Sequence, residues 1–131
     1  MRTICIAVLA LVPAVAQANW VKVAETRDTV YYVDPATIRA DGSVRQVWEL
    51  QDFADKRPNG ARSRRALFEF DCSAERWRVL SIADHAEAKA GGTAFGTWAG
   101  QSEWSYIAAR TGTNIPASAT NRTILRFVCS Q

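Results

Sequence analysis

Apolar and polar side chains alternate along much of the chain with a period of two, which is typical of β-strands that bury one face. Runs rich in β-branched and aromatic residues predict strands at 20–24, 29–33, 43–53, 63–72 and 77–82. Turn signals lie between them, such as Asp41-Gly42, Pro58-Asn59-Gly60 and Ser73-Ala74-Glu75. Because these strands follow one another through turns, we expect a mainly antiparallel, meandering sheet.

The phase of the alternation assigns side chains to the two faces of the longest strands. In the strand at 43–53, one face carries Val44, Trp48 and Leu50, and the other carries Arg45, Glu49 and Gln51. In the strand at 63–72, Ala66, Phe68, Phe70 and Cys72 lie opposite Leu67, Glu69 and Asp71. From this phase we interpret Trp48 as a core residue.

The alternation weakens in the last third of the chain. Residues 84–100 are rich in Gly and Ala, so we expect a loop there with a short strand at 94–98. A last strand is expected at 103–109, followed by a connector at 111–117.

Two helical segments are predicted. Asp34 can cap a single turn and Pro35 can take its first position. A longer helix is expected at 119–128 with Ser118 as its cap, and one side of it carries Ile124, Leu125 and Val128. Because that apolar side must be buried, we expect the helix to pack on one face of the sheet.

The first eighteen residues have the pattern of a secretory signal peptide. Arg2 precedes a short apolar run, and Ala16-Gln17-Ala18 is an A-x-A cleavage site, so the mature chain is expected to begin at Asn19. The apolar run is too short to span about 30 Å of hydrocarbon. No later segment is apolar enough to cross a membrane. We therefore expect an exported protein without a transmembrane segment after processing.

Processing would leave two cysteines, Cys72 and Cys129, since Cys5 leaves with the signal. In an oxidising compartment such a pair forms a structural disulfide by default. A metal or redox pair fits less well, because there is no C-x-x-C and only one histidine. The predicted fold class is α+β: a single antiparallel meander sheet of about six strands, with a C-terminal helix packed on one face and tied by this disulfide.

The formal net charge of +3 is mild and does not indicate a nucleic-acid-binding protein. The basic residues nevertheless crowd one turn between two strands: Lys56, Arg57, Arg62, Arg64 and Arg65. Such a hairpin tip can bind a polyanion or an acidic patch on a partner protein. Alternatively, it is a solvated loop whose charges discourage edge pairing.

Catalytic signatures are missing from the sequence. The single histidine, His85, lies in the polar stretch 84–87, and we interpret it as an exposed loop residue. No nucleophile elbow, zinc-protease motif, phosphate-binding loop or dinucleotide fingerprint is present. We expect a protein that is not an enzyme and that has no metal or cofactor.

Several motifs, in this order along the chain, resemble the surface-adhesin protein E-like family of Gram-negative bacteria. They are Tyr32–Arg39, Asp41-Gly42, Val47–Asp52, Phe68–Cys72, Arg76–Leu80 and Val128-Cys129. The resemblance covers nearly the whole of residues 19–131, which we assign as one protein E-like domain. It implies a six-stranded antiparallel sheet with a C-terminal helix held against its concave face by the disulfide.

The same resemblance implies an adhesin-like role at the outer surface, with host extracellular-matrix or plasma proteins such as vitronectin and laminin, or an envelope component, as partners. An alternative is a periplasmic inhibitor or small-molecule-binding protein. An exposed strand edge would also allow a homodimer.

Overall fold

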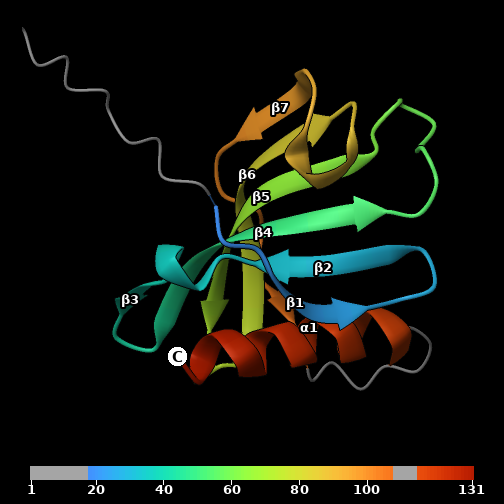
Figure 1. The fold of residues 1–131 in the computed structure, drawn as a ribbon. Coiled ribbons are helices and arrows are strands. Elements are labelled where there is room, and N and C mark those ends of the chain that lie inside the picture. The colour runs from blue at the N-terminus through green and yellow to red at the C-terminus, as the bar shows by residue number, and fades with distance from the viewer. Residues whose placement is uncertain (1–17, 108–114) are drawn as a thin grey trace, which may run out of the picture.

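One antiparallel sheet and one helix make up the molecule, a computed structural model that describes residues 18–107 and 115–131 (Figure 1). The strands are β1 Val21–Glu25, β2 Thr29–Val33, β3 Arg39–Asp41, β4 Val44–Phe53, β5 Ser63–Asp71, β6 Arg76–His85, β7 Ala94–Ala99 and β8 Ser105–Tyr106. Two 3-10 turns are η1 Pro35–Thr37 and η2 Ala88–Ala90, and the helix is α1 Ile115–Cys129. The predicted signal peptide, 1–18, lies outside the described residues except for Ala18.

The sheet has the strand order β1-β2-β4-β5-β6-β7, with every neighbouring pair antiparallel. The short strands extend this path, since β3 pairs with the beginning of β4 and β8 with the beginning of β6. The sheet therefore follows the order of the chain, as the turn signals predicted. The fold class of an open antiparallel meander with one C-terminal helix is confirmed.

The predicted turns are present for the expected reasons. Gly42 and Gly60 have φ values of +57° and +92°, which a side chain would strain. At η1, the Asp34 carboxylate accepts a hydrogen bond from the Ala36 amide at 3.1 Å, and Pro35 begins the turn. Local sequence signals are therefore sufficient for these connections.

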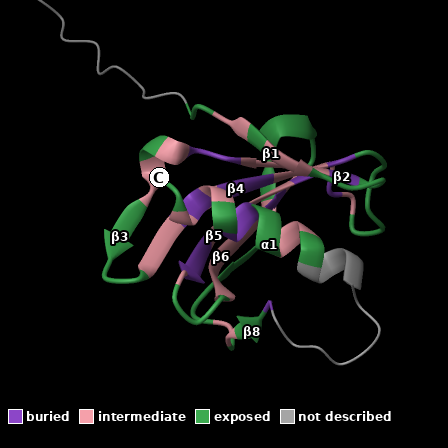
Figure 2. Cartoon of the chain, turned by 90° about the horizontal axis from the view of Figure 1, so that it is seen from below, coloured by how far each residue is buried: buried purple, intermediate pink, exposed green. Residues whose placement is uncertain are grey.

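The hydrophobic core lies between α1 and one face of the sheet, where buried residues of β2, β4 and β5 face those of the helix and partly buried residues of β1 and β6 pack around them (Figure 2). Its fully or nearly fully buried members are Val33, Val47, Ala66, Phe68, Phe70, Ile107, Ile124, Leu125 and Val128. The predicted apolar side of the helix and the predicted apolar phase of β5 are confirmed. We call this side of the sheet the helix face and the opposite side the outer face.

The prediction for Trp48 is wrong in its choice of face. Val47 pairs with Phe68 and Glu49 with Ala66, so the helix face of β4 carries Val47 and Glu49. Trp48 lies on the outer face and is only partly buried. A period of two separates the faces of a strand without saying which one a helix will cover.

The ends of several elements also differ from the prediction. The helix begins at Ile115 rather than at residue 119, and the last strand is limited to Ser105–Tyr106. Residues 108–114 of the predicted strand and connector lie outside the described part of the chain. His85 is the last residue of β6 and partly buried, so its interpretation as an exposed loop residue is wrong.

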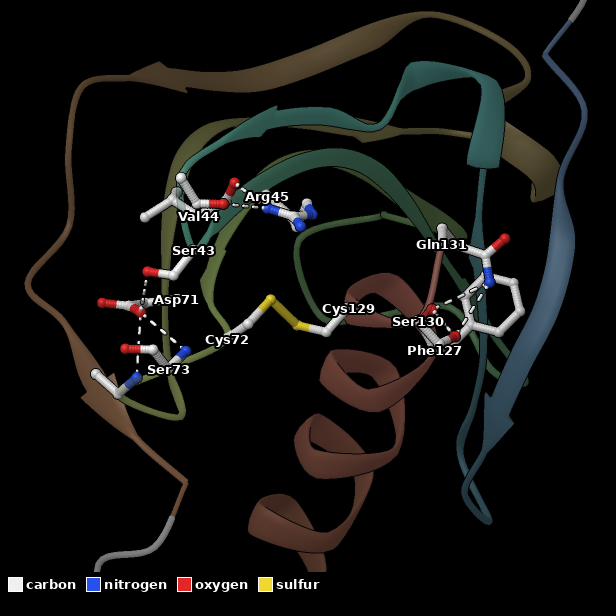
Figure 3. Close-up of a disulfide and its surroundings, with 12 residues drawn as sticks. Ser43, Val44, Arg45, Asp71, Cys72, Ser73, Phe127, Cys129, Ser130 and Gln131 are labelled. Carbon is white, nitrogen blue, oxygen red and sulfur yellow. Dashed lines mark hydrogen bonds between the residues drawn. A yellow bond between two sulfur atoms is a disulfide. The ribbon is translucent and has the colours of Figure 1, made fainter.

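A disulfide joins Cys72, directly after β5, to Cys129, the last residue of α1 (Figure 3). The Cα atoms are 5.9 Å apart and the cysteines are 57 residues apart in sequence. This confirms the predicted pairing and its role, because the bond ties the helix to the sheet. Chain-entropy arguments give such a loop about 4 kcal/mol of stabilisation.

Candidate binding site at the β4–β5 hairpin

An open cavity of about 340 Å³ lies at the β4–β5 hairpin. Its lining consists of Gln51, Phe53, Arg57, Pro58, Asn59, Ala61 and Arg64. Gln51 and Arg64 are register partners and share the helix face with Val47 and Phe68. The cavity therefore occupies the part of that face towards the hairpin, while α1 packs on the part around Phe68 and Phe70.

The hairpin loop is held in place by its own hydrogen bonds. The Arg57 amide donates to the Ala61 carbonyl, and the Gly60 amide donates to the Arg57 carbonyl. The Asn59 side chain accepts from the Ala61 amide and donates to the Asp84 carboxylate at 2.9 Å. Asn59 thus connects the loop to β6, which gives the cavity a defined wall.

Arg57 supplies the free positive charge of the site. Its guanidinium lies 4.1 Å above the centre of the Phe53 ring and donates to the Thr29 hydroxyl at 3.2 Å. Within the described residues, no carboxylate forms an ion pair with it. Arg57 is exposed, so a partner can reach its remaining donors.

Arg64 is neutralised within the site. It donates to both carboxylate oxygens of Asp84, at 2.7 Å from Nε and 3.3 Å from Nη2. Burial of Asp84 raises the pKa of its carboxyl, but the hydrogen bond and charge of Arg64, together with the Asn59 hydrogen bond and the charge of His85, outweigh burial and hold this pKa below its ordinary value. Arg64 therefore shapes the wall of the cavity and adds little net charge.

The structure divides the five predicted basic residues among different surroundings. Lys56 and Arg57 are exposed in the hairpin loop, and Arg62 is partly buried at its end. Arg65 lies on the outer face, where its guanidinium stacks 3.8 Å above Trp48, and burial lowers the pKa of Arg65 while the charge of Asp34 raises it. The charge that remains accessible near the cavity is thus concentrated at Lys56 and Arg57.

Glu49 is a feature that the sequence reasoning missed. The residue is 1% exposed, and its carboxylate accepts a hydrogen bond from the Gln51 side chain at 2.9 Å. Burial raises the pKa of Glu49 to about 7, which the Gln51 hydrogen bond only partly opposes. The pKa of Tyr31 is also raised, by burial and then by the charge of Glu49. The position of Glu49 between Trp48 and Leu50 was the only available signal.

The outer face offers a contrasting cluster in which every charge is paired. Arg76 pairs with Asp71 and Arg78 with Glu69, and both guanidinium groups lie within 4.3 Å of the centre of the Trp104 ring. We interpret this cluster as structural. In the part of the chain that the structure describes, no group of His, Cys, Asp and Glu side chains is arranged to hold a metal ion. The described helix is too short and too polar to span a membrane.

The comparisons with known proteins agree with this fold. The family model described as surface-adhesin protein E matches residues 20–130, so the chain belongs to this family. No curated protein matches the chain. Solved structures of Haemophilus influenzae protein E are similar: the selenomethionine form has a TM-score of 0.61 at 14% identity and covers 91% of this chain and 92% of that one. Crystal form II has a TM-score of 0.58 at 14% identity, with 90% and 92% covered.

Proposed function

We propose that this member of the surface-adhesin protein E family is an exported, non-enzymatic protein that binds an acidic segment of a host matrix or plasma protein at the β4–β5 hairpin. The observation that carries the proposal is Arg57, an exposed guanidinium at an open cavity that forms no ion pair with any described residue. Lys56 adds a second exposed charge beside it. Phe53 holds Arg57 in place through its ring.

Family membership supports an adhesin-like role at the outer cell surface. The fixed hairpin supports a site that is formed before the partner arrives, because a pre-organised guanidinium loses less freedom on binding a carboxylate. Exposed charges of this kind steer association and make binding sensitive to salt.

Binding of the mature domain to immobilised vitronectin and laminin, measured by surface plasmon resonance, tests the proposal. We expect a Lys56→Ala/Arg57→Ala variant to bind about tenfold more weakly, chiefly through slower association. Arg39→Ala is the matched control, because Arg39 is exposed on β3, which pairs with the beginning of β4, away from the hairpin. Equal binding by the two variants would refute a role for the hairpin charges.

A second candidate function is a periplasmic carrier or inhibitor that takes a small molecule. The cavity volume of about 340 Å³ favours it, because this size is within the range of ligand pockets. Protease treatment of intact cells separates the two functions. An adhesin is cleaved on intact cells, whereas a periplasmic carrier is cleaved only after the outer membrane is opened.

The predicted homodimer stays a prediction. Within the described sheet, β1 and β7 end the main strand path, and the short strands β3 and β8 are also paired on one side only. Light scattering of the purified mature domain measures the oligomeric state directly.

A further inference from the structure

The beginning of the described chain lies against a buried carboxylate. The backbone nitrogen of Asn19 is 3.2 Å from Oδ2 of Asp34, and the Asp34 residue is only 6% exposed. Asn19 directly follows the Ala16-Gln17-Ala18 motif. The atom that signal cleavage would free is therefore the atom that already contacts Asp34.

Asp34 is held rigidly for this contact. Its Oδ1 accepts from the Ala36 amide at 3.1 Å, and its own amide donates to the Trp48 carbonyl. Its carbonyl oxygen accepts from the amide and the hydroxyl of Thr37. With the backbone and Oδ1 engaged in this way, Oδ2 is directed at Asn19.

Within the described part of the chain, no side chain supplies this carboxylate with a direct counter-charge. Among the ion pairs of the described residues, none involves Asp34. Arg65, which stacks on Trp48, is the cation whose charge acts on it from a greater distance. A buried carboxylate without a close cation is unfavourable, and a cation placed at Oδ2 would relieve this.

We propose that Asp34 is a binding site for the α-ammonium group of the mature N-terminus. A signal-processing peptidase hydrolyses the Ala18–Asn19 bond: water supplies the hydroxyl of the Ala18 carboxylic acid, which releases its proton to solvent, and the hydrogen that makes the Asn19 amine. The amine takes up a proton from solvent, because an α-amino group has a pKa of about 7.7–8.0. The neutral amide donor of the precursor becomes a charged donor at the same position, which strengthens the hydrogen bond.

Processing thereby joins the mature N-terminus to Asp34 through an ion pair. Asn19 leads into β1, an edge strand that pairs with β2 and also contacts α1. The ion pair joins that edge to η1, so the mature protein is more stable than the same domain with residues still attached. This inference rests on the export part of the proposed function and is independent of any partner.

Mass spectrometry of the exported protein is the first test, and we expect a mature chain that begins at Asn19. A chain that begins elsewhere overturns the inference, and an uncleaved chain also refutes export. Neither result depends on binding to host proteins, so a failed adhesion assay leaves this inference intact.

Urea unfolding of recombinant forms then measures how much the ion pair contributes to the free energy of unfolding. Urea is used because, unlike guanidinium chloride, it adds no salt that would screen the pair. We expect a form that retains Ala18 to have an unfolding equilibrium shifted by about tenfold towards the unfolded state, which is about 1.4 kcal/mol. An Nα-acetylated chain beginning at Asn19 should lose the same amount, because it keeps the N–H donor and lacks the charge.

Asp34→Asn provides the control, since asparagine also caps η1 but carries no charge. In this background the three N-terminal forms should be equally stable. Equal stability of the free and acetylated forms with Asp34 present would overturn the proposal, as would a difference that persists with asparagine. If Asp34→Asn does not fold, the difference in stability between the free and acetylated forms of the parent still tests the proposal.

Discussion

The helix face of the sheet has two regions of opposite character, although the same strands run through both. Around Phe68, Phe70 and Val128 it is apolar and buried beneath α1, next to the disulfide. Towards the β4–β5 hairpin it is open and carries Arg57 and Arg64. We call these the helix-covered region and the hairpin region.

Coverage by the helix explains the difference. Val47 of β4 and Ala66, Phe68 and Phe70 of β5 belong to the core where α1 packs, whereas their strand neighbours Gln51 and Arg64 are polar where the face opens at the cavity. Apolar burial is favourable where a second layer excludes water. Glu49 lies between the two regions, as a carboxylate that is fully buried and has no ion pair among the described residues. We therefore expect the helix-covered region to contribute most to stability, and the binding that we propose belongs to the hairpin region.

The largest effect is expected from removing the disulfide of the helix-covered region. A Cys72→Ser/Cys129→Ser variant should lose about 4 kcal/mol of unfolding free energy, because the unfolded chain regains loop freedom. Urea unfolding with and without a reducing agent measures this. The reductant should lower the parent to the level of the variant and leave the variant unchanged. A parent that does not respond to reduction would show that the bond does not stabilise the helix-covered region.

The second effect concerns Glu49, at the boundary. Its pKa rises from 4.5 to about 7 on folding, so the folded state holds a proton more tightly than the unfolded state. Stability is therefore complete below pH 4.5 and falls as the pH rises to 7, by about 3 kcal/mol. Glu49→Gln should remove this loss.

Urea unfolding at pH 4 and pH 8 tests whether Glu49→Gln removes the loss of stability at higher pH. The variant should match the parent at pH 4 and exceed it at pH 8. Glu103→Gln, at an exposed position, is the control: it keeps Glu49 and should follow the parent at both pH values. A constant difference between Glu49→Gln and the parent would contradict the burial of an ionisable carboxyl at this boundary.

A smaller effect is expected from the wall of the hairpin region. Asp84→Asn weakens the hydrogen bonds from Arg64 and Asn59 and should cost about 1–2 kcal/mol, discounted because Arg64 is partly exposed. Because the pKa of Asp84 is lowered, the stabilisation is present above its ordinary value of 3.8 and is lost as the pH falls through the lowered pKa.

Urea unfolding at pH 7 and pH 2.5 measures the contribution, and the deficit of the variant should shrink at the lower pH. Glu25→Gln is the matched control, because the Lys22–Glu25 pair is exposed on both sides and its loss should have no measurable effect. Equal effects of the two variants would mean that the hairpin wall is no more than a solvated surface.

The smallest effect on stability is expected from Arg57→Ala, about 0.5 kcal/mol, since an exposed cation–π contact contributes little. The same variant removes the exposed guanidinium charge on which the proposed function depends. Thermal unfolding measures the change in stability, and the binding assay measures the loss of affinity. A large loss of stability would mean that the hairpin region supports the fold as well as binding.

Local signals allowed much of the fold to be predicted. The turns at Gly42 and Gly60, the cap at Asp34 and the apolar phase of β5 depend on residues within a few positions of each other. The cysteine pair followed from their number and the expected compartment. The candidate site was predicted only as a cluster of basic residues. The sequence does not show that Arg64 forms an ion pair with Asp84 or that Arg65 stacks on Trp48.

The chain's own pattern thus specified its strands, its helix and the disulfide that joins them, because period, turn residues and cysteine count are properties of short segments. The tertiary structure decided which face the helix covers, and with it the partial burial of Trp48 on the outer face and the full burial of Glu49. The physical reason is that alternation is symmetric between two faces. Only the docking of α1, whose last residue Cys129 is 57 residues from its disulfide partner Cys72, makes one of them an interior.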